Sequence, residues 1–102
     1  MRMTDDELLQ FMEKTLRNVI ALRRTKAMDY SDPHDAFSGL RRVAQEMELT
    51  EAKTLLVFMA KHWDTIRWYV IRGDGRHSEE IDGRIDDMIV YLILLKAVLK
   101  NQ

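Results

Sequence analysis

The 102-residue chain has no cysteine, a single proline and four glycines. Without cysteine it can form neither a disulfide nor a thiolate metal site, and it has no thiol nucleophile. Residues 1–6 do not form a signal peptide, and the longest apolar run, residues 88–95, is too short to span a bilayer. From these absences we expect a cytoplasmic protein of a reducing compartment with no membrane partner.

The chain also lacks an excess of charge of either sign, since its formal net charge is −1. Proteins that bind nucleic acid usually carry an excess of lysine and arginine, so we expect no nucleic-acid partner. Hydrophobic residues make up 46% of the chain and charged residues 32%, a composition that favours a folded protein. This length suits a single domain with one core.

Apolar residues recur at three- and four-residue steps in four segments, which predicts helices over about 5–28, 33–47, 51–72 and 78–100. Thr4 with Glu7 is typical of a capping box, Asp32 followed by Pro33 of a helix start, and Thr50 of a further N-cap. Gly73 and Gly75 indicate a turn before the last helix. No segment alternates with a period of two residues, so the sequence predicts an all-α fold, a four-helix antiparallel bundle.

The predicted helix over 78–100 is apolar over more than half of its circumference. Its main stripe consists of Ile81, Ile85, Met88, Leu92, Leu95 and Leu99, and three further residues widen it: Ile89, Leu94 and Val98. A helix with so wide an apolar face either lies at the centre of the core or contacts a second chain. We expect a homodimer, or a higher homo-oligomer, with this helix or the helix over 5–28 at the interface.

Polar side chains interrupt the apolar surface of the same helix. Arg84, Asp87 and Tyr91 share one stripe because they lie three and four residues apart. One interpretation is an intrahelical ion pair with a tyrosine at the edge of the core, and the other is the mouth of a polar pocket. In the helix over 51–72, Lys61 could bind a phosphate or merely extend to water, and His62 could be a ligand-binding or a core residue.

A third group of polar residues lies between the first two predicted helices, and includes Lys26, Asp29 and Tyr30. The N-terminus of the following helix is flanked in the sequence by Arg23, Arg24, Arg41 and Arg42. Helix N-termini bind anions, so this region is either a phosphate site or a solvated basic surface.

Metal binding is less well supported. Five carboxylates, Glu79, Glu80, Asp82, Asp86 and Asp87, crowd the start of the last predicted helix. A magnesium site in a helical protein needs carboxylates that converge from two helices, and the helix over 51–72 offers Lys61 and His62 instead. We therefore predict no metal site, and the sequence contains no zinc, phosphate-loop or serine-triad motif that would identify catalytic residues.

Several short motifs together resemble one family. They are Lys26, Asp29, Tyr30 and Asp32 with Phe37, then residues 41–44, residues 57–62, and Arg84, Asp87 and Tyr91. In their order and spacing they resemble the nucleotide modification associated domain 1 family, small α-helical proteins frequent in bacteriophages and prophages. The resemblance runs from about Lys26 to Leu99 and implies a nucleotide-like ligand more than a particular reaction.

The layout is also similar to the MazG-type all-α nucleoside triphosphate pyrophosphatases, which hold magnesium with Glu-x-x-Glu and Glu-x-x-Asp motifs. Here Arg84 stands three residues before Asp87, and an arginine would repel the ion. The resemblance thus implies a binding protein for a nucleotide or nucleotide-derived signal, which a phage protein could sequester from host immunity. The residues expected to bind it are Lys26, Asp29, Tyr30, Lys61, His62, Arg84, Asp87 and Tyr91. The alternatives are a magnesium-dependent pyrophosphatase, the one case that needs a cofactor, and a helical protein-interaction module.

Overall fold

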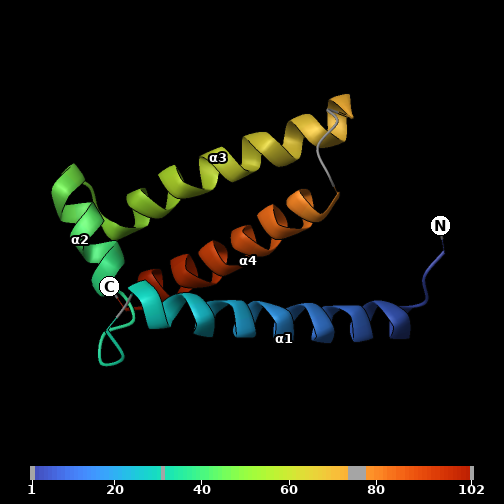
Figure 1. The fold of residues 1–102 in the computed structure, drawn as a ribbon, viewed down its shortest axis with the longest axis horizontal. Coiled ribbons are helices and arrows are strands. Elements are labelled where there is room, and N and C mark those ends of the chain that lie inside the picture. Colours follow the sequence, from blue (N-terminus) through green and yellow to red (C-terminus); the bar gives the residue numbers. More distant parts are fainter. Residues whose placement is uncertain (1, 31, 74–77, 102) are drawn as a thin grey trace.

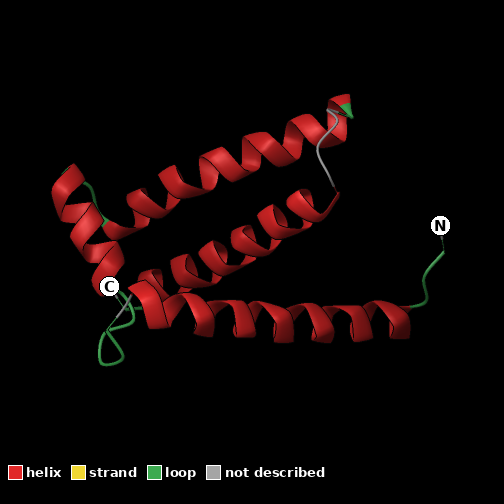
Figure 2. Ribbon diagram, viewed as in Figure 1, coloured by secondary structure: helices red, strands yellow, loops and turns green. Residues whose placement is uncertain are grey.

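The computed structural model describes residues 2–30, 32–73 and 78–101, with the backbone alone for residues 26–30, 78 and 79. It contains four helices, α1 (Asp5–Tyr30), α2 (Ser38–Met47), α3 (Glu51–Arg72) and α4 (Ser78–Lys100) (Figure 1). The described residues form helices and loops and no strand (Figure 2), and their only β-type pairing is an isolated bridge between Asp32 and Asp35. The predicted all-helical class is therefore confirmed.

The three long helices form layers with α4 in the middle. α3 packs antiparallel against α4, and α1 contacts the opposite side of α4 (Figure 1). α1 and α4 run in the same direction and diverge toward their N-termini. A regular up-and-down bundle would place these two helices antiparallel. The difference arises because α2 has only 10 residues and crosses one end of the layers, so it does not act as a full-length helix of the bundle.

The helix ends are set by local hydrogen bonds. The Thr4 hydroxyl accepts from the Glu7 amide at 3.1 Å, and the Thr50 hydroxyl accepts from the Lys53 amide, also at 3.1 Å. Both are N-cap bonds that satisfy an amide with no partner inside the helix. α3 ends at Gly73, which adopts a left-handed conformation with φ of 59° and donates its amide to Tyr69. These predicted caps are confirmed.

The predicted boundaries around Pro33 are wrong. α1 continues to Tyr30 instead of ending near Met28, and α2 begins at Ser38 instead of Pro33. The Asp32 carboxylate accepts from the His34 amide at 2.8 Å and so closes a turn, and does not cap a helix. The Asp35 carboxylate does the same for the Phe37 amide at 3.1 Å. Two successive aspartate turns of this kind compete with helix formation over residues 32–37.

The core lies between α3 and α4. Leu55, Met59 and Val98 are buried, and half-buried side chains pack around them: Phe37, Leu40, Ala52, Phe58, Met88, Tyr91, Leu94 and Leu95. Thr54 is the one polar side chain that is buried among the described residues, and its hydroxyl donates to the Thr50 carbonyl at 2.8 Å. A buried hydroxyl with an acceptor carries no unsatisfied donor, so it is compatible with this core.

The predicted apolar stripe of α4 is partly wrong. Ile85, Leu92 and Leu99 are exposed, whereas Tyr91 and Val98 belong to the core. The side of α4 that faces α3 is therefore displaced from the predicted stripe. Because α4 is apolar around most of its circumference, spacing alone could not choose between neighbouring stripes.

α1 leaves most of its apolar residues uncovered. Its Val19 is buried, but six large apolar side chains are between 45% and 58% exposed: Leu8, Leu9, Phe11, Met12, Leu16 and Ile20. None of the helices, as far as their residues are described, is long and apolar enough to cross a membrane.

Candidate functional site

Three of the five polar residues that the sequence placed on α3 and α4 meet between these two helices, namely His62, Arg84 and Tyr91. Arg84 Nη1 of α4 lies 3.2 Å from His62 Nδ1 of α3. Because an arginine can only donate, Nδ1 of the imidazole is the acceptor in this contact. Glu80 Oε1 lies 3.9 Å from Arg84 Nη2, one turn earlier on α4. Helix periodicity brings Glu80 and Arg84 to the same side.

Aromatic rings continue from this contact toward the core. The rings of His62 and Tyr91 lie 5.5 Å apart between centroids, and those of Tyr91 and Phe58 lie 5.9 Å apart. Both pairs are tilted, in the range of favourable aromatic contacts. Four side chains from two helices thus form one row along the α3–α4 contact: Arg84, His62, Tyr91 and Phe58.

The other predicted site residues are not part of this row. Asp87 is half-buried on α4, within the same part of the helix as Arg84. Lys61 is exposed on α3, next to His62 in the chain. The side chains of Lys26, Asp29 and Tyr30 lie outside the described residues, although their backbone belongs to α1.

A hollow of about 340 Å³ opens beside this row, where the C-terminal half of α1 meets α2, α3 and α4. Its walls contain three aromatic rings, those of Phe37, Phe58 and Tyr91, together with Arg23 and Arg42. The volume lies at the small end of the ~300–1,000 Å³ typical of small-molecule sites. Tyr91 belongs to both the hollow and the row, so the two are continuous. We call this hollow the aromatic–arginine pocket.

Two of the four arginines that flank the start of α2 in the sequence thus line this pocket. Arg23 donates to the Ala36 carbonyl at 3.0 Å, which fixes its guanidinium beside the pocket. Arg42 is exposed. Over the described residues, neither Arg23 nor Arg42 forms an ion pair with a carboxylate. Both therefore keep donors that an anionic ligand could use.

Arg41 has a different role, which sequence reasoning missed. It forms an ion pair with Asp35, and its Nε lies 3.5 Å from Glu51 Oε1. The hydrogen bond from Arg41 lowers the pKa of the Asp35 carboxyl below its ordinary value, and the same bond raises the pKa of Arg41. The three residues join the loop to α2 and α3. Their separations along the chain follow no helical period, so spacing gave no signal for them.

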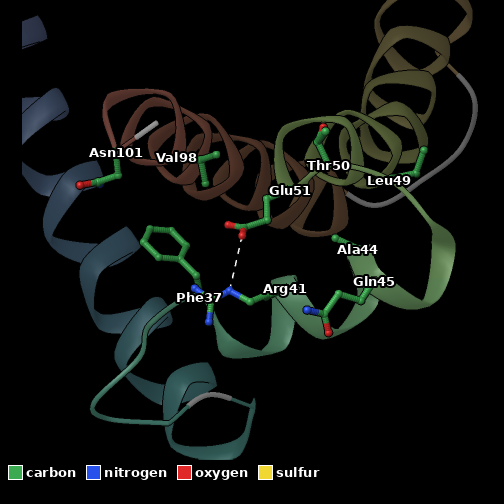
Figure 3. Close-up of a pocket in the computed structure, with 9 residues that line it drawn as sticks. All are labelled: Phe37, Arg41, Ala44, Gln45, Leu49, Thr50, Glu51, Val98 and Asn101. Carbon is green, nitrogen blue, oxygen red and sulfur yellow. Dashed lines mark ion pairs between the residues drawn. The ribbon is translucent and has the colours of Figure 1, made fainter.

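A second hollow, of about 510 Å³, lies on the other side of Phe37, between α2, the start of α3 and the end of α4 (Figure 3). The Glu51 carboxylate points toward Arg41 across it. Two further polar residues of its wall form contacts within the chain, since the Asn101 side-chain amide donates to the Ala97 carbonyl at 2.8 Å and the Thr50 hydroxyl caps α3. The polar wall of this hollow therefore serves mainly to hold α2 against α3.

The carboxylates of α4 repel one another. Burial, and then the charges of Asp82 and Asp87, raise the pKa of Asp86 above its ordinary value. In the part of the chain that the structure describes, no three histidine, aspartate or glutamate side chains are grouped so that they could hold a metal ion.

Comparison of the chain with protein-family models, with curated proteins and with solved structures gave no match.

Proposed function

We propose that this protein binds a nucleotide or a nucleotide-derived signalling molecule in the aromatic–arginine pocket. One observation carries the proposal, namely that a single pocket combines three aromatic rings with two arginines that have no carboxylate partner among the described residues. Aromatic faces stack on nucleobases, and guanidinium groups donate in pairs to phosphate oxygens. A nucleotide carries both of these chemical groups, at a separation that a pocket of this size spans.

Different residues of the pocket then bind different parts of the nucleotide. Phe58 and Tyr91, which already contact each other, provide a rigid surface for the base. Arg23 and Arg42 face the phosphate from α1 and α2. Arg23 is held by Ala36, so little side-chain entropy is lost when it binds an anion.

The row beyond Tyr91 extends the site. His62 and Arg84 continue from Tyr91 along the α3–α4 contact, and Arg84 is only 22% exposed. A ligand longer than a mononucleotide would reach this second cation. We expect dinucleotides and ADP-ribose-type molecules to bind more tightly than nucleoside monophosphates for that reason.

The resemblance to the nucleotide modification associated domain 1 family supports this proposal, because the family implies a nucleotide-like ligand. Its frequent occurrence in phages favours sequestration of a signalling nucleotide in the host cytoplasm. We propose a homodimer as the binding unit, since α1 leaves a wide apolar side uncovered.

The experiment is calorimetric titration with mononucleotides, cyclic dinucleotides and ADP-ribose-type nucleotides, with the matching nucleosides and inorganic phosphate as partial ligands. The substitution Arg42→Gln should weaken the affinity for the tightest-binding nucleotide by roughly 10–100-fold, which is the usual effect of losing one charged hydrogen bond. Arg67→Gln is the matched control, because Arg67 is an exposed arginine of α3 that contacts Trp68 instead of the pocket. No heat with any nucleotide, or equal losses in the two variants, would remove the proposal.

The same samples test the hydrolytic alternative. Release of pyrophosphate that requires Mg²⁺ and stops with a chelator would make the protein a pyrophosphatase, whereas binding without turnover would support sequestration.

A further inference from the structure

Over the residues whose burial is described, α1 carries six exposed large apolar side chains, more than any other helix. At the point where α1 and α4 meet, Arg23, Arg24 and five apolar side chains line a hollow of about 170 Å³: Val19, Ile20, Val90, Ile93 and Leu94. From there the helices diverge toward their N-termini (Figure 1). The exposed apolar residues of α1 extend along its length away from this point. We call this surface the α1 face.

The α1 face supplies much of the apolar area of a stable protein interface. Six large apolar side chains of α1 and Ile93 of α4 are about half exposed. They would present on the order of 350 Å² of apolar surface, if each offers roughly half of the area of a buried leucine or phenylalanine. A standard interface buries about 800 Å² on each partner, of which about 65% is apolar in homodimers. The α1 face therefore accounts for about two thirds of that apolar area, and a second helical surface would cover it.

The charges on α1 indicate which surface that is. The first turn of α1 contains three acidic residues, Asp5, Asp6 and Glu7. Arg17 lies at its middle, and Arg23 and Arg24 lie in its second half. Asp6 and Arg24 lie about five full turns apart and so share one flank of the helix, and Arg17 lies on the same flank because it precedes Arg24 by two turns. When two α1 helices pack antiparallel about a twofold axis, this flank of one helix faces the same flank of the other. Acidic residues of each copy then lie opposite basic residues of the other copy at both ends of the interface.

We propose that the α1 face binds the α1 face of a second copy of this chain, with the two α1 helices antiparallel about a twofold axis near the middle of the apolar stretch. A twofold interface needs a surface that is complementary to itself, and acidic and basic ends flanking an apolar centre meet that requirement. Each copy covers the half-exposed leucines of the other. This inference deepens the homodimer of the proposed function, and because self-association is measured without ligand, its failure is distinguishable from a failure of nucleotide binding.

The first test is the mass of the protein without ligand, measured by sedimentation at concentrations up to about 100 µM. We expect a dimer, and we expect the double substitution Leu9→Glu and Leu16→Glu to weaken self-association at least ~100-fold. The control is Val70→Glu with Ile71→Glu, which changes two equally exposed apolar residues of α3 and should leave the dimer intact. Far-UV circular dichroism shows whether each variant keeps its helices. A monomer at every concentration, or a dimer that only the α3 control disrupts, overturns the proposal.

The second test addresses the antiparallel order. Asp5→Lys with Asp6→Lys, and separately Arg17→Glu with Arg24→Glu, each place like charges at both ends of the interface and should weaken self-association about 10-fold. An equimolar mixture of the two double variants restores opposite charges at both ends, so it should form a heterodimer as tight as the original dimer. Weak association that persists in the mixture overturns the antiparallel arrangement.

Discussion

Two neighbouring leucines of α3 provide a sharp test of how this helix packs. Leu55 is 1% exposed and belongs to the core between α3 and α4, whereas Leu56 is 57% exposed. The substitutions Leu55→Ala and Leu56→Ala remove the same atoms from the same kind of helix position. Any difference in their effect on stability therefore reports burial and not helix propensity.

The expected losses differ several-fold. Truncation of a buried leucine removes its transfer free energy and leaves a cavity, which together cost about 3 kcal/mol in a site as closed as that of Leu55. Domains of this size lose ~4–8 °C of Tm for each kcal/mol, so Leu55→Ala should melt roughly 15 °C lower. Leu56→Ala should change the free energy of unfolding by less than ~0.5 kcal/mol.

Urea unfolding followed by far-UV circular dichroism measures both variants. All samples need the same protein concentration, because self-association changes the apparent stability. Equal losses, or a larger loss for Leu56→Ala, would show that α3 presents a different side to α4. The row of Phe58, His62 and Tyr91 would then be wrongly placed as well, since it depends on the same rotation of α3.

Two further predictions concern α3 and α4. Gly73→Ala should lower the free energy of unfolding by ~1–2 kcal/mol because Gly73 has φ of 59°. Gly83→Ala, inside α4 with open space around it, should raise it by ~0.5–1 kcal/mol. Urea unfolding measures both, and effects of the same sign would contradict one of the two predictions. Asp86→Asn should stabilise the protein at neutral pH, because burial and the neighbouring carboxylates raise the pKa of Asp86 above its ordinary 3.8. The folded state then binds more protons than the unfolded state in the window above 3.8, so the original chain loses stability as the pH rises through that window. The advantage of Asp86→Asn should vanish below the window, and a pH-independent difference would contradict the stated cause.

The sequence predicted those features that depend on near neighbours in the chain. The caps at Thr4 and Thr50 and the end of α3 at Gly73 each involve contacts within four residues. Such contacts form in the same way in almost any tertiary surrounding. The prediction for the start of α2 failed for a related reason, since the turns closed by Asp32 and Asp35 take the place of a helix that would begin at Pro33.

Features that depend on how the helices rotate about their axes were less predictable. Helical spacing correctly grouped Arg84 and Tyr91 on one stripe of α4, and that stripe does face α3. It could not show that His62 accepts from Arg84, because the partner lies on another helix. The aromatic–arginine pocket draws its lining from all four helices, and only their packing brings Arg23 and Arg42 near Tyr91.

The divergence of α1 from α4 has a consequence for the order in which this protein folds. α3 and α4 are neighbours in the chain, so their hairpin closes a short loop and should form early, whereas the α1–α4 contact joins segments about sixty or more residues apart. An isolated helix is marginal in water without tertiary contacts. Amide hydrogen exchange should accordingly be slowest around Leu55 and Met59, and fastest along the first turns of α1, which in a lone chain have no neighbouring helix to slow their opening.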